Sequence, residues 1–333
     1  MKIIYKLLFL FLLTIGYSSC DFLDIVPDEI TTEADAFKDR NAAKNFVYSC
    51  YGYLPQSNVA SGSLDLLTGD EVITAFEHET FASFPKGNYT ASSPVISYWN
   101  TFFQGLRQCY IFLENVDKVP DLTESVKTDY IAQVKFLIAY YHYQLARCYG
   151  PIILIKELPD VNASQAEYLP RTSYDECVDW ICNLLDEAAS SLPAIRTNKE
   201  DYGLATSVGA KAVKAKMLLY AASPLFNGNS SFYSNFTDKS GSQLMPLTYD
   251  PNKWVKAKTA IKEAIDLAEQ NGHALYVKQD YKIGNEDANP YPAAGPVRCL
   301  RTSLVDWDSR NPEVLLAETR SVWYTKQIVT ICD

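Results

Sequence analysis

Apolar residues recur at intervals of three and four along most of this chain, and that spacing predicts amphipathic helices. The longest such run steps by four or three residues throughout; its members are Val126, Tyr130, Val134, Leu137, Tyr141, Leu145 and Cys148. Phe136, Tyr140 and Tyr143 form a second apolar face of the same helix. Because a helix that is apolar on two sides packs between neighbours, we expect this one to lie inside a stack of helices and to end at Gly150-Pro151.

The same spacing predicts five further helices, most of them with a recognisable first residue. Their expected ranges are about 33–53, 93–113, 173–192, 206–223 and 251–271. The helix-start signals are N-cap residues, prolines at the first helical position and one capping-box pattern; they are Thr32, Ser93-Pro94, Ser173 with Glu176, and Asp250-Pro251.

The last predicted helix and two extended segments complete the pattern. Four residues of that helix should face the core, namely Trp254, Ile261, Ile265 and Ala268, and Gly272 should follow its end. The segments 152–155 and 313–319 are expected to be extended, the second of them as a strand.

These elements predict a mainly α fold with long irregular loops and a few short strands. Helices with small and aromatic residues on both faces suit a stacked helix-turn-helix solenoid, because each pair buries its faces only against the next pair. Tetratricopeptide-like pairs are the form we expect. The usual period of about 34 residues is absent because long insertions separate the helices.

The N-terminus predicts a segment for export. Lys2 and Lys6 precede an apolar stretch at 7–15, and small residues follow before Cys20, which is the layout of a secretory signal peptide. The end of this segment resembles a bacterial lipobox, which implies cleavage before Cys20 and a lipid anchor on it. An ordinary cleaved signal with an incidental cysteine is the alternative. We divide the chain into a lipoprotein signal peptide at 1–19, an acidic linker at 20–32 and a helical domain at 33–333.

The composition excludes some classes of function and favours others. The 40 acidic residues outnumber the 30 basic ones, so the formal net charge of −10 has the wrong sign for binding nucleic acid. Tyr, Phe and Trp together make up 13% of the chain, and such rings suit wet interfaces and flat apolar ligands. No Walker A loop, GxGxxG turn or Cys/His zinc spacing occurs, so we expect no cofactor and no metal site.

Five strings in the chain together resemble the SusD/RagB family of nutrient-binding outer-membrane lipoproteins of the Bacteroidetes. They are Cys20-Asp21-Phe22-Leu23-Asp24-Ile25-Val26-Pro27; Tyr98-Trp99-Asn100 leading to Phe112-Leu113-Glu114-Asn115-Val116; Lys135-Phe136-Leu137 through Ala139-Tyr140-Tyr141 to Tyr149-Gly150-Pro151; Tyr220-Ala221-Ala222-Ser223-Pro224-Leu225-Phe226-Asn227; and Asn311-Pro312-Glu313-Val314. They occur in the family's order along the whole chain.

The resemblance implies a surface-exposed lipoprotein of the cell outer membrane that binds a glycan, oligosaccharide or peptide. Its partner would be a SusC-like TonB-dependent transporter, docked on the tetratricopeptide-like helices. Acidic residues after Cys20 are similar to signals for export to the cell surface, although a solvated linker explains them equally well. Family members are usually longer, so we expect the C-terminal part of the family domain to be missing. A helical scaffold lipoprotein that binds no nutrient is therefore the second hypothesis.

Candidate ligand residues lie between the first two predicted helices, because sugars are recognised by aromatic rings and polar groups in irregular segments. Asp70 and Glu71 belong to Thr68-Gly69-Asp70-Glu71, which resembles an acidic turn of the family, and the ligand candidates after it are Phe76, His78, Phe81 and Tyr89. The alternative is that Phe76, Phe81 and Phe84 form a small apolar cluster beneath the loop. Trp99 is expected to pack in the core.

A glycoside hydrolase is the third hypothesis, since Asp70, Glu71, Glu77 and Glu79 cluster and such enzymes use two carboxylates. A solvated acidic loop explains the cluster better. His78-Glu79 begins like a zincin helix, but Ala82 stands where the second His ligand should be. We therefore assign no catalytic residue and expect a protein that is not an enzyme.

Overall fold

The computed structural model describes residues 33–55, 80–160, 162, 164, 169–277, 299, 303, 311–321 and 324–330. The helices of eight residues or more are α3 (Arg40–Tyr51), α5 (Trp99–Asn115), α6 (Glu124–Tyr149), α7 (Tyr174–Ser191), α8 (Ser207–Ala222) and α10 (Asn252–Gln270). The shorter elements are α2 (Glu33–Ala36), η2 (Thr80–Ser83), η3 (Val116–Lys118), η5 (Lys199–Asp201) and α9 (Ser230–Tyr233), and the strands are β1 (Val314–Ser321) and β2 (Tyr324–Thr330).

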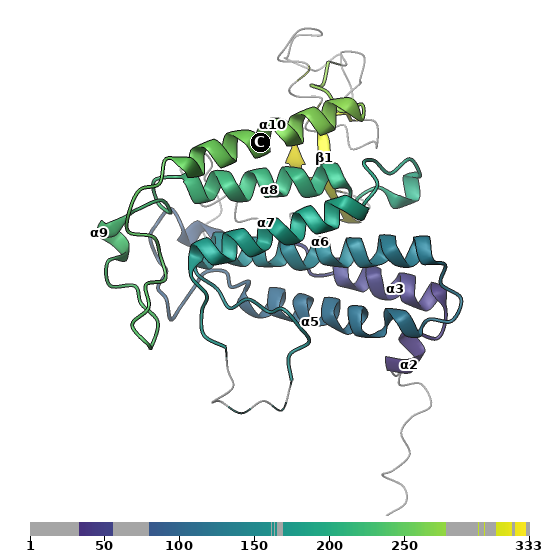
Figure 1. The fold of residues 1–333 in the computed structure, drawn as a ribbon, viewed down its shortest axis with the longest axis horizontal. Coiled ribbons are helices and arrows are strands. Elements are labelled where there is room, and N and C mark those ends of the chain that lie inside the picture. The colour runs from purple at the N-terminus through teal and green to yellow at the C-terminus, as the bar shows by residue number, and fades with distance from the viewer. Residues whose placement is uncertain are drawn as a thin grey trace, which may run out of the picture.

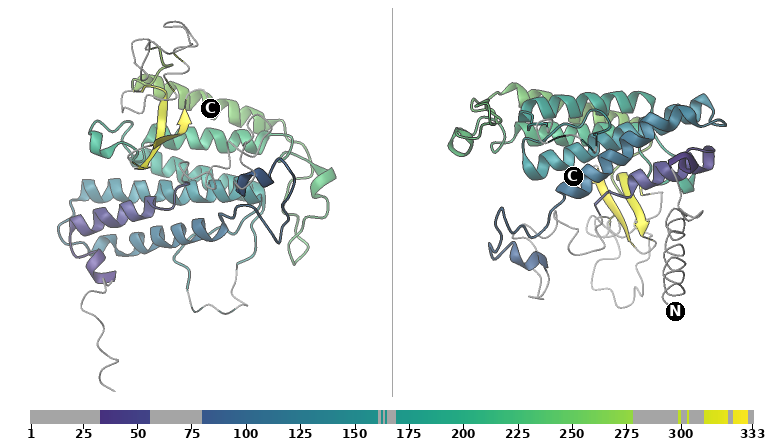
Figure 2. Two further views of the ribbon diagram at one scale, coloured as in Figure 1. Left: turned by 180° about the vertical axis from the view of Figure 1, so that it is seen from behind. Right: turned by 90° about the horizontal axis from the view of Figure 1, so that it is seen from below.

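The longer helices form a stack in which each packs on the next along the chain. From α10 at the upper edge the stack passes through α8 and α7 to α6, and α3 and α5 both lie below α6, where α3 contacts both α5 and α6 (Figure 1). β1 and β2 form an antiparallel pair that lies behind α8 in the view of Figure 1 and contacts it (Figure 2). The expected mainly α fold of successively packed helices is confirmed.

α6 is the centre of the stack, as its two apolar faces predicted. Phe136, Leu137, Tyr140 and Tyr141 are all buried, and α5 and α7 pack on either side. The helix ends at Gly150, whose φ of +71° lies in the left-handed region that suits glycine. A helix with two apolar faces thus has neighbours on both.

The first predicted helix is broken in two. α2 ends at Ala36 and α3 begins at Arg40, because Asp39 acts as N-cap and accepts a hydrogen bond from the Ala42 N–H at 2.8 Å. The break lets Phe37 enter the core, where its ring contacts Phe46 at 4.9 Å and Phe112 at 6.1 Å. The uninterrupted helix was therefore wrong, and Thr32 lies outside the described residues.

α5 begins at Trp99 rather than at Ser93-Pro94. The Ser93 backbone is used in a turn, where it exchanges hydrogen bonds with Thr90 at 3.1 and 3.2 Å. The Tyr98 N–H, at the true start of the helix, donates to the Tyr149 hydroxyl at 2.8 Å. A hydroxyl from the end of α6 thus supplies the acceptor that the local sequence does not.

α7 and α8 begin and end within one residue of their expected positions, and their N-caps differ. Thr206 accepts a hydrogen bond from the Gly209 N–H at 3.0 Å at the start of α8. Ser173 is the N-cap of α7, yet its side chain makes no capping hydrogen bond, so the capping box with Glu176 was wrong.

The inward face of α10 differs from the expected one. Alanines line the contact with α8, namely Ala257, Ala260, Ala264 and Ala268, and Ala215 of α8 meets them. Trp254 is 41% exposed and Ile265 is 36% exposed, while Ile261 is partly buried. The alanines allow the two helices to lie close together and leave the large side chains outside. The expected inward positions of Trp254 and Ile265 were wrong, whereas Ala268 and the C-terminal Gly272 (φ +88°) are as expected.

The expected strand at 313–319 is present as β1, and its partner β2 was not foreseen. Val314 pairs with Thr330 and Ser321 with Tyr324, with irregular register between them. The other extended segment, at 152–155, joins no sheet among the described residues. Instead, its last residue is tied to two helices: the Ile155 N–H donates to His142 of α6 and the Ile155 carbonyl accepts from Tyr110 of α5.

Candidate functional site

Tyr89 is the predicted ligand residue whose side chain the structure describes, and it lies on a tight turn after η2. The Gly87 N–H donates to the Phe84 carbonyl and the Asn88 N–H to the Ser83 carbonyl, both at 3.0 Å. Gly87 has a φ of +67°, which other residues adopt rarely. The turn holds the Tyr89 ring against Phe84, with 5.4 Å between ring centroids, and leaves 53% of Tyr89 exposed.

Residues with hydroxyl groups follow Tyr89 directly in the chain. The Thr90 and Ser92 hydroxyls are 3.2 Å apart, and the Thr90 hydroxyl accepts a hydrogen bond from the Ser93 N–H at 3.0 Å. All three residues are exposed. An exposed ring beside hydroxyls offers an apolar face and hydrogen-bonding groups, the combination that fixes small polar ligands.

The remaining predicted site residues are not placed. Asp70, Glu71, Phe76 and His78 lie outside the described residues, as do Glu77, Glu79 and the lipidation residue Cys20. Phe81 belongs to η2, but its side chain is also outside the described part. Their roles stay predictions.

Trp99 packs in the core, as expected. Its ring contacts Phe103 at 4.9 Å and meets the edge of Tyr149 at 5.2 Å. The Arg171 guanidinium lies over the same ring at 5.3 Å and donates to the Pro151 carbonyl at 2.7 Å. Trp99 therefore helps to fix the end of α6.

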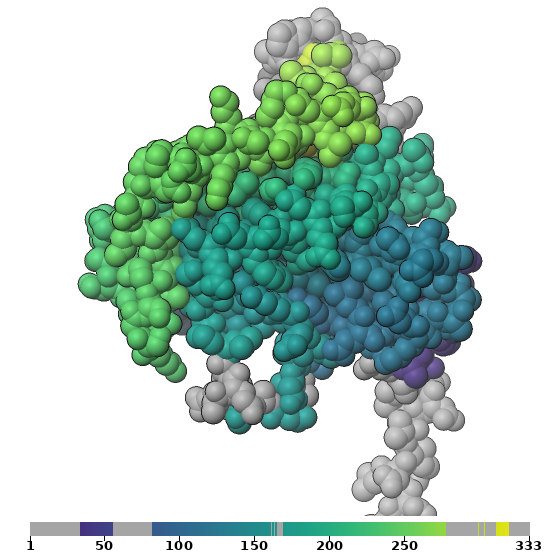
Figure 3. Space-filling model, viewed as in Figure 1, coloured from purple at the N-terminus to yellow at the C-terminus, as the bar shows by residue number. Residues whose placement is uncertain are grey.

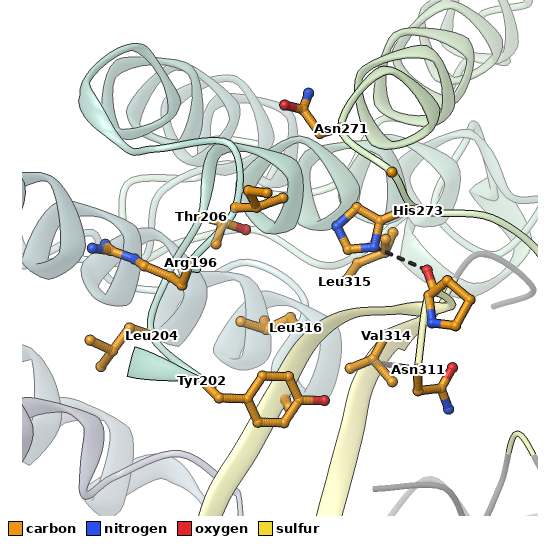
Figure 4. Close-up of a pocket in the computed structure, with 15 residues that line it drawn as sticks. Arg196, Tyr202, Leu204, Thr206, Asn271, His273, Asn311, Val314, Leu315 and Leu316 are labelled. Atoms are coloured by element: carbon orange, nitrogen blue, oxygen red, sulfur yellow. Dashed lines mark hydrogen bonds between the residues drawn. The ribbon is translucent and has the colours of Figure 1, made fainter. Parts of the chain in front are cut away.

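A cavity of about 310 Å³ lies between β1 and the chain that leads into α8 (Figure 4). Its polar lining includes Asn271, His273 and Asn311, and its apolar lining includes Leu204 and Val314. The His273 Nδ1 atom is 3.0 Å from the Pro312 carbonyl, which fixes the ring at the mouth of β1. No residue of this cavity was among the sequence candidates.

A second cavity, of about 240 Å³, lies on the other side of the turn Tyr202-Gly203-Leu204. Tyr48, Glu200 and Glu318 contribute to its lining. The turn contacts β1 closely, because a Cβ atom on Gly203 would lie 2.9 Å from the Thr319 side chain. The two cavities are therefore neighbours that share this turn.

A partly buried polar network joins Arg196, which lines the first cavity, to Tyr51, which lines the second. The Arg196 guanidinium donates to both carboxylate oxygens of Asp129, at 2.8 and 3.0 Å, and to the Ala205 carbonyl at 2.9 Å. The Tyr51 hydroxyl donates to Gln133 at 3.0 Å and accepts from the Ala205 N–H at 2.9 Å. Burial raises the pKa of the Tyr51 hydroxyl, so it keeps its proton and remains a donor. The network joins α3, α6 and the chain before α8.

These surfaces suit binding through rings, amides and hydroxyls. In the described part of the chain, no three His, Cys, Asp or Glu side chains are grouped as ligands for a metal ion. Among the same residues, no helix has the length and apolarity needed to cross a membrane. Sequence reasoning missed the cavities because their walls come from segments that lie far apart in the chain, which no local pattern brings together.

Sequence reasoning also missed an exposed aromatic surface on the loop between α8 and α10. Phe232 of α9 is 75% exposed and Tyr249 is 57% exposed. This loop and α10 form the outer edge of the face seen in Figure 3. The signal was available, because both rings stand in an irregular segment rich in Ser and Asn, like the predicted Tyr89 segment.

Residues 21–219 match the SusD-like family model described as "Starch-binding associating with outer membrane". Among curated proteins, the SusD-like protein P25 of Formosa agariphila is 23% identical over 230 residues, which cover 65% of this chain and 43% of that protein.

Solved structures show the same fold. The structure named BT4246 is 32% identical with a TM-score of 0.74, covering 85% of this chain and 51% of that one. A SusD-like protein from Bacteroides fragilis NCTC 9343 is 20% identical with a TM-score of 0.61, covering 87% of this chain and 46% of that one. This chain thus spans about half the length of these relatives.

Proposed function

Because this chain belongs to the SusD-like family, we propose that it is a glycan-binding lipoprotein of the outer membrane that works with a SusC-like TonB-dependent transporter. The observation that carries the proposal is the match of residues 21–219 to a family described as starch-binding and associated with the outer membrane. That range contains the helices from α3 to α7 and most of α8. In this proposal the stacked helices are the scaffold and the surface loops bind the ligand.

The proposed ligand surface is the segment that ends at Tyr89. Its support is the exposed Tyr89 ring, held by Phe84 and flanked by the Thr90 and Ser92 hydroxyls. A pyranose stacks a C–H face on such a ring while its hydroxyls bond to the neighbouring polar groups. His78, with Asp70 and Glu71, completes the proposed surface on sequence grounds alone.

The test of this surface is the variant Tyr89→Ala, with Tyr249→Ala as a control of nearly equal exposure (53% and 57%). Binding to soluble starch and to a panel of neutral oligosaccharides is measured by affinity electrophoresis and calorimetry. We expect Tyr89→Ala and His78→Ala each to weaken affinity for the bound glycan by about tenfold, roughly 1.4 kcal/mol, with unchanged melting temperature. Loss of binding in Tyr249→Ala alone would move the site to the loop before α10.

The anchor and the partner are tested together by mass spectrometry of the native protein, purified in mild detergent from the outer membrane. We expect an acylated Cys20 as the first residue, removal of residues 1–19, and a large barrel that co-purifies. An acylated Cys20 without a co-purifying barrel would favour the helical scaffold lipoprotein, and an unmodified Cys20 would overturn the lipid anchor. In this arrangement residues 20–32 link the lipid to the helical domain, which faces the cell exterior.

Binding without turnover is the expected behaviour towards the glycan. Incubation with soluble starch and the same oligosaccharides, followed by assay of new reducing ends, should give the rate seen without protein. Turnover that disappears in Asp70→Asn or Glu71→Gln would instead support the glycoside hydrolase hypothesis.

A further inference from the structure

α3 and α5 approach each other more closely than ordinary side chains allow. A Cβ atom built on Gly105 of α5 would lie 2.9 Å from the Tyr53 Cβ, just after α3, and 3.0 Å from the Tyr141 ring. Cβ atoms in real proteins are not found that close to another Cβ atom, so this contact needs a glycine at position 105. The ends of the two segments are therefore fixed against each other at this point.

Two cysteines lie close to that contact along the chain. Cys109 follows Gly105 by four residues and shares its face of α5, and Cys50, in the last turn of α3, precedes Tyr53 by three residues. Both are completely buried in the same apolar core. Both are free thiols in the structure, and their side chains are hydrogen-bonded to each other. The Tyr141 hydroxyl also donates to the Cys50 carbonyl and holds that residue in place.

The same burial makes these thiols poor nucleophiles once the protein has folded. Removal from water raises the pKa of the Cys109 thiol, and the adjacent Cys50 raises it further. Because the thiolate is the reacting form in disulfide exchange, a bond between the two would have to form before the core closes. After folding, the same burial would protect it from reductants.

We propose that Cys50 and Cys109 form a disulfide that joins α3 to α5 in the exported protein. The proposal rests on the export contained in the proposed function, because disulfides persist outside the cytosol. The two S–H bonds break and one S–S bond forms. The two protons and two electrons pass to a disulfide-containing oxidant, a thiol–disulfide oxidoreductase of the cell envelope, which becomes a dithiol.

The bond would close a loop of about 60 residues that contains the whole segment between α3 and α5. Cross-links stabilise mainly by restricting the unfolded chain, and more so for longer loops. We expect the melting temperature of the oxidised protein to exceed that of the reduced protein by roughly 5–10 °C.

The experiment starts from the full chain, expressed with its own signal peptide and alkylated in denaturant before digestion without reductant. We expect the peptides of Cys50 and Cys109 to be joined, with a mass two hydrogen atoms below that of the separate thiol peptides. Cys109→Ala should lose both the linked peptide and the effect of reductant on melting. Cys182→Ala is the matched control, since it removes another buried cysteine, on α7, and should keep both.

The intact mass separates failure of this proposal from failure of the proposed function. Alkylated Cys50 and Cys109 in a protein that has lost residues 1–19 would overturn the disulfide and leave export intact. A chain that keeps residues 1–19 would overturn the export on which the bond depends. As an independent check, the purified chain is refolded in a glutathione redox buffer, where failure to link Cys50 to Cys109 would overturn the pairing itself.

Discussion

α6 and α10 are both long helices with a regular apolar pattern, yet they are buried in opposite ways. α6 has helices packed on both sides, and Phe136, Tyr140 and Tyr141 are enclosed between them. α10 packs mainly on α8 and does so through alanines, leaving Trp254 41% exposed. An apolar stripe therefore shows which residues lie on one face, whereas the neighbours of the helix decide which face is covered.

The largest loss of stability is expected for a substitution in the core where α5 meets α6. Phe102 is 1% exposed, and its ring stacks on Tyr141 at 5.7 Å and on Tyr98 at 5.2 Å. Phe102→Ala should lower the free energy of unfolding by about 4 kcal/mol, because it removes buried surface and leaves a cavity. Urea denaturation measures this. A loss below about 1 kcal/mol would show that the α5–α6 contact is looser than the structure indicates.

The next largest effect is a pH dependence of stability that comes from His142 in the core of α6. The His142 Nδ1–H donates to the Ile138 carbonyl at 2.8 Å, and Nε2 accepts from the Ile155 N–H at 3.1 Å. Burial lowers the pKa of His142 to about 4, from an ordinary value of 6.5. The unfolded chain therefore binds more protons between pH 6.5 and 4, so the contribution of His142 to stability is complete above pH 6.5 and is lost as the pH falls.

This loss amounts to about 3 kcal/mol between pH 7 and 4. The carboxylates of the protein titrate in the same range, so the measured quantity is the difference in unfolding free energy between the wild type and His142→Gln. We expect that difference to shrink as the pH is lowered from 7 towards 4. A difference that stays constant with pH would mean that His142 is not held neutral.

A smaller effect is expected at the alanine contact of α10. Ala264→Leu adds three carbon atoms where Ala215 and Ala260 already lie close, so it should destabilise the protein by about 2 kcal/mol through overpacking. Glu263→Leu is the matched control, since it places the same side chain at the exposed adjacent position and should change stability by less than about 0.5 kcal/mol. Equal effects of the two variants would contradict the alanine contact.

The smallest effect is expected at Trp254, in contrast to its prominence in the sequence pattern. Because 41% of the residue is exposed, Trp254→Ala should cost no more than about 1 kcal/mol, far below the loss expected for Phe102→Ala. Thermal and urea denaturation of both variants under the same conditions test this ranking. A Trp254 variant as unstable as the Phe102 variant would show that this residue is covered in the folded protein.

The sequence predicted only part of the candidate site, just as it predicted only some of the inward residues of α10. Tyr89 could be chosen from the sequence because an aromatic residue in an irregular segment has no helical stripe to join, and the structure leaves it exposed. The two cavities beside β1 could not be chosen. Both have walls from the turn at Tyr202 and the strand at Ala317, and Tyr48 of α3 adds to the second, a combination that only folding brings together.

The sequence by itself determined the helices from α6 to α8, because their limits depend on local signals such as Gly150 and Thr206. A helix with apolar residues on two faces also requires two neighbours. It also determined the family, through short strings kept in order. Only the tertiary structure decided that α10 turns its alanines to α8 and that Cys50 meets Cys109. These outcomes depend on how closely two backbones can approach, which is a property of residues distant in the chain and has no periodicity to reveal it.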